Sequence, residues 1–152
     1  MGKAQLEQLE KYGNYISVPK GISMRPMIRN RQDAFEIQRL EKAARRYDIV
    51  MYTRGKNDQG VIHRVYRVRE KDYVIFGDNC WQKEIIPKEK VAGIAVRFCR
   101  KGKWHDMQTS RGYRLYAWLW TNTLFLRRPV LWVRDLGKRA VRKMRKVFAR
   151  NE

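Results

Sequence analysis

Apolar and polar residues alternate along several short segments of the chain, and turn-forming residues separate these segments. The alternation is clearest in residues 60–68, where His63 and Val65 fall on one face of a strand and Arg64 on the other. By the same pattern we expect strands near residues 15–20, 34–39, 47–53, 60–69, 72–77 and 91–99. Stretches rich in Gly, Asn, Asp and Lys lie between them and favour turns. The pattern predicts a mainly β core.

The last third of the chain follows a helical pattern instead. Residues 113–126 form an aromatic and apolar run that is too short and too interrupted to span a bilayer. Beyond Pro129, which we expect to divide the tail, apolar residues recur at helical spacing and basic residues occupy the other faces. The apolar positions are Val133, Leu136, Ala140, Met144 and Val147, and the basic ones are Arg134, Lys138, Arg142, Lys143, Arg145 and Lys146. The pattern predicts a C-terminal α-helical extension whose second segment is a basic amphipathic helix.

Two shorter segments complete the expected organisation. Residues 1–11 are typical of a short amphipathic helix, and the charged residues 39–46 favour a short helical connection. We therefore expect an N-terminal helical segment over 1–14, a β core over 15–106 and a basic helical tail over 107–152. A chain of 152 residues, 43% of them hydrophobic, is the size of one domain and is long enough to bury a sizeable core.

The number of cysteines and the hydropathy of the N-terminal segment indicate the expected cellular location. Cys80 and Cys99 are too few for a disulfide framework and are expected to be free thiols in a reducing compartment. The polar N-terminal segment lacks the apolar core of a secretory signal or of a membrane span. We therefore expect a cytoplasmic location, with the tail able to hold the protein peripherally on the inner face of a membrane.

The net charge of +20 requires a partner or a solvated surface. Half of it lies in residues 111–152, which carry twelve Lys and Arg against Asp135 and Glu152. Three interpretations of the tail stay open. Residues 113–150 could bind an anionic membrane surface, or the helices could pack on the core or dock a protein partner. Nucleic acid is the third and is disfavoured, because the chain has no nucleic-acid reading motif.

One serine stands in an unusual context. Ser23 lies in Gly21-Ile22-Ser23-Met24-Arg25-Pro26, and the Gly and Pro of this stretch are typical of a turn. Apolar residues before and after the turn would display the hydroxyl beside apolar walls. A serine hydroxyl becomes a useful nucleophile only when a neighbouring base takes its proton. Ser23 is therefore either a turn residue or a nucleophile that needs a base.

The chain offers few candidates for that base. Histidine titrates near neutral pH and is the commonest general base, although a single histidine in a strand is more often structural. The two histidines are His63, in a predicted strand, and His105, in the polar loop around residues 102–106. The base for Ser23 is therefore His63 or a lysine.

Four motifs in order carry a resemblance to a known family. They are Ser-Met-Arg-Pro at 23–26, Tyr-Asp-Ile-Val-Met-Tyr at 47–52, His-Arg-Val at 63–65 and Gly-Asp-Asn at 77–79. This series resembles the peptidase core of the type I signal peptidase superfamily, which includes the self-cleaving SOS repressors, and it spans residues 15–98. The endoplasmic-reticulum type is the most similar, because it has histidine where other members have lysine.

The resemblance implies roles for individual residues. Ser23 would be the nucleophile, His63 the general base, and an acid would orient the imidazole. The family's aspartate six positions after that of Gly-Asp-Asn corresponds to Glu84; Asp78 is the alternative acid, unless it only closes a turn. Gly21 stands where many relatives carry a serine oxyanion donor, which leaves the backbone N–H of Ser23 as the expected donor. No metal or cofactor is expected.

The sequence thus favours a serine endopeptidase that cleaves a peptide or a segment of a precursor protein, after small residues if the resemblance extends that far. The alternative is a catalytically inactive module that uses the same fold to bind a peptide or a protein partner. Gly21, the glutamate at position 84 and the lack of a membrane anchor motivate that alternative. A basic nucleic-acid-associated protein is the third possibility.

Overall fold

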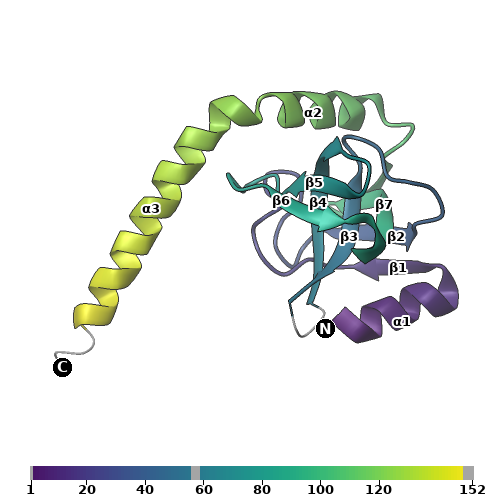
Figure 1. Ribbon diagram of the computed structural model, residues 1–152, viewed down its shortest axis with the longest axis horizontal. Helices are drawn as coiled ribbons and strands as arrows, with labels where there is room; N and C mark the ends of the chain where they lie inside the picture. The colour runs from purple at the N-terminus through teal and green to yellow at the C-terminus, as the bar shows by residue number, and fades with distance from the viewer. Residues whose placement is uncertain (1, 56–58, 149–152) are drawn as a thin grey trace.

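The computed structural model describes residues 2–55 and 59–148 and shows a mainly β protein with C-terminal helices, which confirms the predicted fold class (Figure 1). The helices are α1 (Gly2–Tyr12), α2 (Arg111–Asn122) and α3 (Leu124–Phe148), with a 3₁₀ turn at Lys88–Lys90. The strands are β1 (Asn14–Ser17), β2 (Ala34–Arg39), β3 (Ile49–Arg54), β4 (Gln59–Val68), β5 (Asp72–Phe76), β6 (Glu84–Pro87), β7 (Val91–Arg100) and β8 (Lys103–Asp106).

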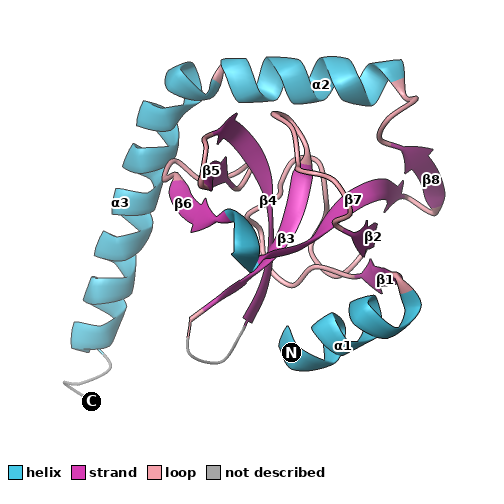
Figure 2. Cartoon of the chain, turned by 45° about the vertical axis from the view of Figure 1, so that its right-hand side comes forward, coloured by secondary structure: helices cyan, strands magenta, loops and turns pink. Residues whose placement is uncertain are grey.

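All eight strands belong to one antiparallel sheet. Its order is β1-β2-β7-β3-β4-β5-β6, and β8 pairs with β7 (Figure 2). The register shifts by one residue between Val65 and Arg67 of β4, and β7 has one extra residue where it pairs with β2 and another where it pairs with β3. Such bulges bend and twist strands, so the sheet curls and encloses a core on each face.

The central strand β3 supplies both cores. It lies between β7 and β4, and its alternating side chains separate into two buried clusters. Ile49 and Met51 join the first cluster, together with residues from α1, β2, β7 and the 24–28 turn. Val50 and Tyr52 join the second, with residues from β4 and β5. Because Val50 pairs with His63 of β4, the histidine emerges on the side of the second cluster.

Two expectations about individual segments are wrong, and one strand was not expected. Residues 39–46 contain no helix, because side chains take up backbone N–H groups: Ala44 N–H donates to Tyr73 Oη and Arg45 N–H to Asp48 Oδ2. The region around residues 102–106, expected to be a loop, contains strand β8, in which His105 pairs with Phe98. Strand β6 was not predicted, because it has only four residues, begins with a charged residue and ends with proline, and so shows little alternation.

The tail divides at Thr123, not at Pro129. Thr123 is the C-cap of α2, with φ −91° and ψ 8°, and its N–H and hydroxyl both donate to the Leu119 carbonyl. Pro129 is the sixth residue of α3 and lacks the N–H that would donate to the Phe125 carbonyl, so the helix continues through it with one hydrogen bond fewer. Of the amphipathic positions predicted in the tail, the side chains of Ala140, Lys143, Arg145, Lys146 and Val147 lie outside the described residues. None of the helices described in residues 2–55 and 59–148 is long and apolar enough to cross a bilayer.

A fully buried ion pair fixes α2 on the sheet. Arg64 of β4 donates from Nε and one terminal nitrogen to the two carboxylate oxygens of Asp78, at 2.8 Å each. Tyr113 of α2 accepts from Arg64 at 3.0 Å, and Tyr116 of α2 donates to Asp78 at 3.0 Å. Burial opposes the charge of Arg64, but Asp78 holds the pKa of the guanidinium above its usual value. The C-terminal helices are therefore attached to the core by buried polar contacts.

We predict that Arg64→Met lowers the free energy of unfolding by about 3–5 kcal/mol, because it leaves the Asp78 carboxylate buried without its cation. Urea denaturation measures the change. Arg67→Met, at an exposed position on the same strand, serves as the control and should stay within about 0.5 kcal/mol of the wild type. Equal effects of the two substitutions would show that the buried pair is not an anchor.

Candidate active site

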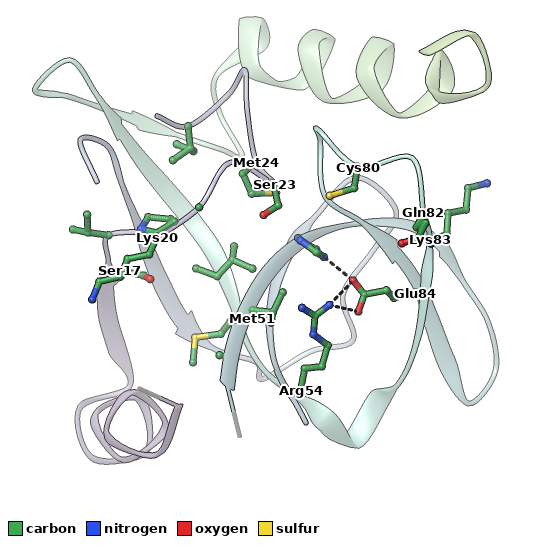
Figure 3. Close-up of a pocket in the computed structure, with 18 of the residues that line it drawn as sticks. Ser17, Lys20, Ser23, Met24, Met51, Arg54, Cys80, Gln82, Lys83 and Glu84 are labelled. Carbon is green, nitrogen blue, oxygen red and sulfur yellow. Dashed lines mark hydrogen bonds and ion pairs between the residues drawn. The ribbon is translucent and has the colours of Figure 1, made fainter. Parts of the chain in front are cut away.

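A cavity of about 920 Å³ opens on one side of the sheet and contains Ser23, His63 and Glu84 in its lining (Figure 3). The connection after β1 forms one wall, strands β3 and β4 form the floor, and residues 80–84 form the opposite wall. In Figure 3 the Ser23 hydroxyl points into the space, and Glu84 lies across it beside Arg54. The fold thus brings segments some 60 residues apart in sequence to one cleft.

The serine lies in a tight turn anchored by buried methionines. Arg25 N–H donates to the Ile22 carbonyl at 3.2 Å, and Met24 and Met27 are buried in the first core. Gly21 has φ +124°, a conformation that L side chains rarely adopt, and its N–H donates to Asn30 Oδ1 at 2.7 Å. A serine at position 21 would be strained there, which accounts for glycine at this position.

His63 is almost completely buried on the cavity floor, with both ring nitrogens in defined surroundings. Its Nδ1 lies 3.2 Å from Tyr52 Oη and 3.4 Å from Glu84 Oε1. Tyr52 and His63 lie diagonally across the β3–β4 pair, because His63 pairs with Val50. Strand register therefore sets this contact.

The hydrogen-bond network assigns the tautomer of His63. Tyr52 donates its one hydroxyl proton to Glu84 Oε2 at 3.1 Å, and an ionised glutamate can only accept. Both neighbours of Nδ1 therefore present acceptors, so Nδ1 carries the proton. Nε2 is left with its lone pair free, as a general base requires.

Glu84 is held in its ionised form. Hydrogen bonding from His63 and from Arg54, whose guanidinium lies 3.1 Å from both oxygens, lowers the pKa of Glu84 from 4.5 to about 2, against the effect of burial. Burial, together with the Glu84 charge, raises the pKa of Tyr52 above its usual range, so Tyr52 stays a neutral donor. A charged carboxylate beside Nδ1 stabilises the imidazolium that forms when Nε2 takes a proton.

The other candidate groups lie elsewhere or are engaged. Asp78 pairs with Arg64 on the far side of β4 and closes the turn after β5. His105 stacks on Phe98 with ring centroids 4.9 Å apart, outside the cavity. Lys83 lies over the Tyr66 ring at 3.5 Å, and Figure 3 shows Lys20 extending toward Ser17.

The thiol of Cys80, which also lines the cavity, is a poor nucleophile. Burial raises the pKa of the Cys80 thiol above 9.0, so the thiol is neutral at physiological pH. Among the described residues, no three His, Cys, Asp or Glu side chains are grouped to hold a metal ion. The chemistry that the cavity can offer is that of Ser23, His63 and Glu84.

Gly77 shows how closely the serine turn approaches the histidine. A Cβ placed on Gly77 would lie 2.8 Å from the Ser23 carbonyl oxygen and 2.9 Å from both His63 Nε2 and Cys80 Sγ. Nε2, the nitrogen with the free lone pair, therefore lies near both the Ser23 turn and the Cys80 sulfur. Within the described residues the Ser23 hydroxyl makes no hydrogen bond to His63. Substrate-free sites of this kind commonly have such loose contacts, which tighten when substrate binds.

The Ser23 N–H is free to act as an oxyanion donor. In residues 2–55 and 59–148 no protein acceptor is assigned to it, whereas the neighbouring Gly21 and Arg25 N–H groups are both bonded. An unpaired N–H at the nucleophile stabilises the negative oxygen of a tetrahedral intermediate. The structure thus supplies one such donor.

The loop after β5 and helix α3 hold the serine turn in place. Asn79 N–H donates to the Ser23 carbonyl at 2.7 Å, and its side-chain amide donates to the Ile22 carbonyl at 3.0 Å. Arg134 of α3 in turn donates to both the side chain and the carbonyl of Asn79. Arg128 donates to the Trp81 carbonyl at 3.1 Å. A continuous set of hydrogen bonds therefore runs from α3 to Ser23.

Sequence reasoning missed three residues of this arrangement. Tyr52 and Arg54 both contact Glu84. The alternation of β3 puts them on the same face as His63, but this can be used to find them only when the pairing of β3 with β4 is known. Arg134 was expected on the polar face of a helix, with no indication that the helix reaches Asn79. Such long-range contacts leave no local pattern.

Comparison of the chain with protein-family models, with curated proteins and with solved structures finds no match.

We predict that Gly77→Ala disrupts the site, because its methyl group would meet a backbone carbonyl that cannot turn away. The reactivity of Ser23 toward a fluorophosphonate should fall at least about tenfold, and thermal stability should fall as well. Gly112→Ala is the control, since its methyl group would meet open space in the first turn of α2. Unchanged reactivity in Gly77→Ala would contradict the close approach.

A second prediction concerns pH. Because the pKa of Glu84 is lower in the folded protein than its usual 4.5, its ionised form stabilises the fold fully above about pH 4.5, and this stability is lost as pH falls toward about 2. Glu84→Gln should therefore be less stable than the wild type at neutral pH, with the difference shrinking below about pH 4.5. Urea denaturation across this range measures it, with Glu70→Gln at an exposed position as the control. A difference that does not change with pH would exclude the Glu84 carboxylate as its source.

Proposed function

We propose that the protein is a serine endopeptidase in which Ser23 is the nucleophile, His63 the general base and Glu84 the acid that orients His63. One observation supports this most directly: Nδ1 of His63 is occupied by Glu84 and Tyr52, while Nε2 lies near the Ser23 turn. This arrangement leaves one ring nitrogen available to accept a proton. The order of the four motifs in the sequence is independent support.

In the proposed reaction, the Ser23 hydroxyl attacks the carbonyl carbon of a peptide bond while Nε2 of His63 takes its proton. The Glu84 carboxylate stabilises the resulting imidazolium, and the Ser23 N–H stabilises the oxyanion. The imidazolium then protonates the leaving amine, and the peptide bond breaks to give an acyl-serine. Water, deprotonated by His63, hydrolyses this ester and restores the serine.

The cavity suits an extended polypeptide segment. One wall is the chain from Ser17 to Gly21, an irregular stretch that follows the outermost strand of the sheet path, β1. Apolar side chains of Met24, Ile28 and Met51 line the space next to Ser23. An extended peptide could lie along this wall with an apolar or small side chain next to the scissile bond. The substrate class is therefore a peptide or an exposed segment of a precursor protein.

A catalytically inactive peptide-binding module is the second candidate. It is supported by the lack of a hydrogen bond between the Ser23 hydroxyl and His63 in the described structure, and by the breadth of the cavity. Such a module would bind an extended segment without cleaving it. Reactivity of Ser23 separates the two candidates.

We also place the activity in the cytoplasm. Cys80 and Cys99 are both free thiols, as in proteins of reducing compartments. Fractionation of cells that express the protein, followed by detection of the free thiols, tests this location.

We predict that a fluorophosphonate labels Ser23, with loss of fluoride as the Ser Oγ–P bond forms. Labelling should be faster at neutral than at acidic pH, because only an unprotonated imidazole can accept the serine proton. His63→Ala should slow labelling at least about 100-fold, and Ser23→Ala should abolish it. Mass spectrometry of the labelled peptide measures both the rate and the site.

Matched controls are available for both residues. Ser17→Ala removes a second serine of the same cavity, and His105→Ala removes the other histidine. Both variants should label like the wild type. Absence of labelling in correctly folded protein would favour the binding module, and labelling independent of His63 would reject the proposed base.

A further inference from the structure

Helix α3 has an unusual orientation, with basic residues toward the core and apolar residues toward solvent. Arg127, Arg128 and Arg134 donate hydrogen bonds to the backbone or side chains of residues 78–81. Large apolar side chains are exposed along the helix: Phe125, Leu126, Val130, Trp132, Val133, Leu136, Val141 and Met144. In a helix that only packs on its own protein, the apolar face is the buried one. The face of α3 exposed here therefore has no partner within the described chain.

These residues form one continuous face. Leu126, Val130, Val133, Val141 and Met144 recur at intervals of three, four or eight residues, which at 100° per residue places them on one side of the helix. Phe125, Trp132 and Leu136 form a second row beside them. Val130 and Phe125 are exposed to 69% and 70%. We call this surface, made of the eight residues, the apolar face of α3.

The position of α3 leaves this face accessible. Figure 1 shows the helix leaving the end of α2 and extending away from the sheet. At 25 residues it is the longest helix described, and its contacts to the core come from its first half, through Arg127, Arg128 and Arg134. The far half extends past the core. A large flat partner could therefore lie along the whole apolar face.

Charge selects among the possible partners. The chain carries +20, half of it in residues 111–152, and Lys138 and Arg142 are exposed on the far half of the helix. A second copy of the chain would bring two strongly positive helices together. Nucleic acid would require a basic face, but the exposed face is apolar and three of the arginines bind the protein's own loop. An anionic phospholipid bilayer satisfies both the apolar face and the surrounding positive charge.

We propose that α3 docks the protein on anionic membranes, lying in the plane of the bilayer with its apolar face at the boundary between headgroups and acyl chains. The positive charge of the tail, Lys138 and Arg142 included, attracts the protein to the anionic surface. The core lies on the aqueous side, because the arginines on the opposite face of α3 hold it there. Since Arg128 also lines the Ser23 cavity, docking keeps that cavity close to the membrane surface.

We predict that the full-length chain co-floats with vesicles of phosphatidylcholine containing about 30% phosphatidylserine and binds vesicles of phosphatidylcholine alone far more weakly. Val130→Gln combined with Val133→Gln should reduce binding at least about tenfold, because two apolar side chains leave the membrane. Lys138→Gln combined with Arg142→Gln should reduce binding to the anionic vesicles several-fold. Each substitution is at an exposed position, so the fold should be retained.

Val68→Gln combined with Ile85→Gln is the matched control, since it removes two exposed apolar side chains of the β core. It should bind vesicles like the wild type. No binding to anionic vesicles, equal binding to neutral ones, or no effect of the Val130 and Val133 substitutions would overturn the proposal. So would a dimer in sedimentation that those substitutions dissociate without any vesicle binding. Ser23→Ala should bind vesicles normally, so this test is independent of peptidase activity.

Discussion

The Arg64 guanidinium has five N–H donors, and a buried guanidinium must satisfy all of them. Two donate to the Asp78 carboxylate, one to the Tyr47 carbonyl, one to the Tyr113 hydroxyl and one to the Met27 sulfur. These acceptors come from the loop after β5, the segment before β3, helix α2 and the serine turn. A single side chain thus fixes four separate segments relative to β4, and the geometry of the cavity depends on it.

Fixing Arg64 also sets the orientation of the residue before it on the strand, His63. Since alternate side chains of a strand point to opposite faces, fixing Arg64 on one face also fixes His63 on the other. His63 then meets Tyr52 and Glu84 on one side and the Ser23 turn on the other. The two acids of this region consequently have distinct tasks. Asp78 neutralises a buried cation, whereas Glu84 remains ionised beside the imidazole.

The β core and the helical tail could be predicted from the sequence because alternation and helical spacing are local patterns. The serine, the histidine and a choice of two acids could also be identified, from motif order. The choice between Glu84 and Asp78 could not be made, because it depends on which face of β4 each acid approaches. The boundary at Thr123 is marked by neither Gly nor Pro, and the lack of a helix over residues 39–46 depends on hydrogen bonds between backbone and side chains, such as that from the Ala44 N–H to the Tyr73 hydroxyl. In α3 the apolar face points outward, the reverse of the usual arrangement in which it is buried. Only the contacts of its arginines with the core reveal this orientation.

The hydrogen bonds from α3 to Asn79, and from Asn79 to the Ser23 carbonyl, also bear on how the protein matures. Protein chains are synthesised from the N-terminus, so residues 23, 63 and 84 leave the ribosome well before residues 111–134. Until α2 covers the Arg64–Asp78 pair and Arg134 reaches Asn79, the serine turn lacks part of its support. A nascent chain therefore carries an incompletely supported serine turn, which becomes fixed only when the last helices of the fold are in place.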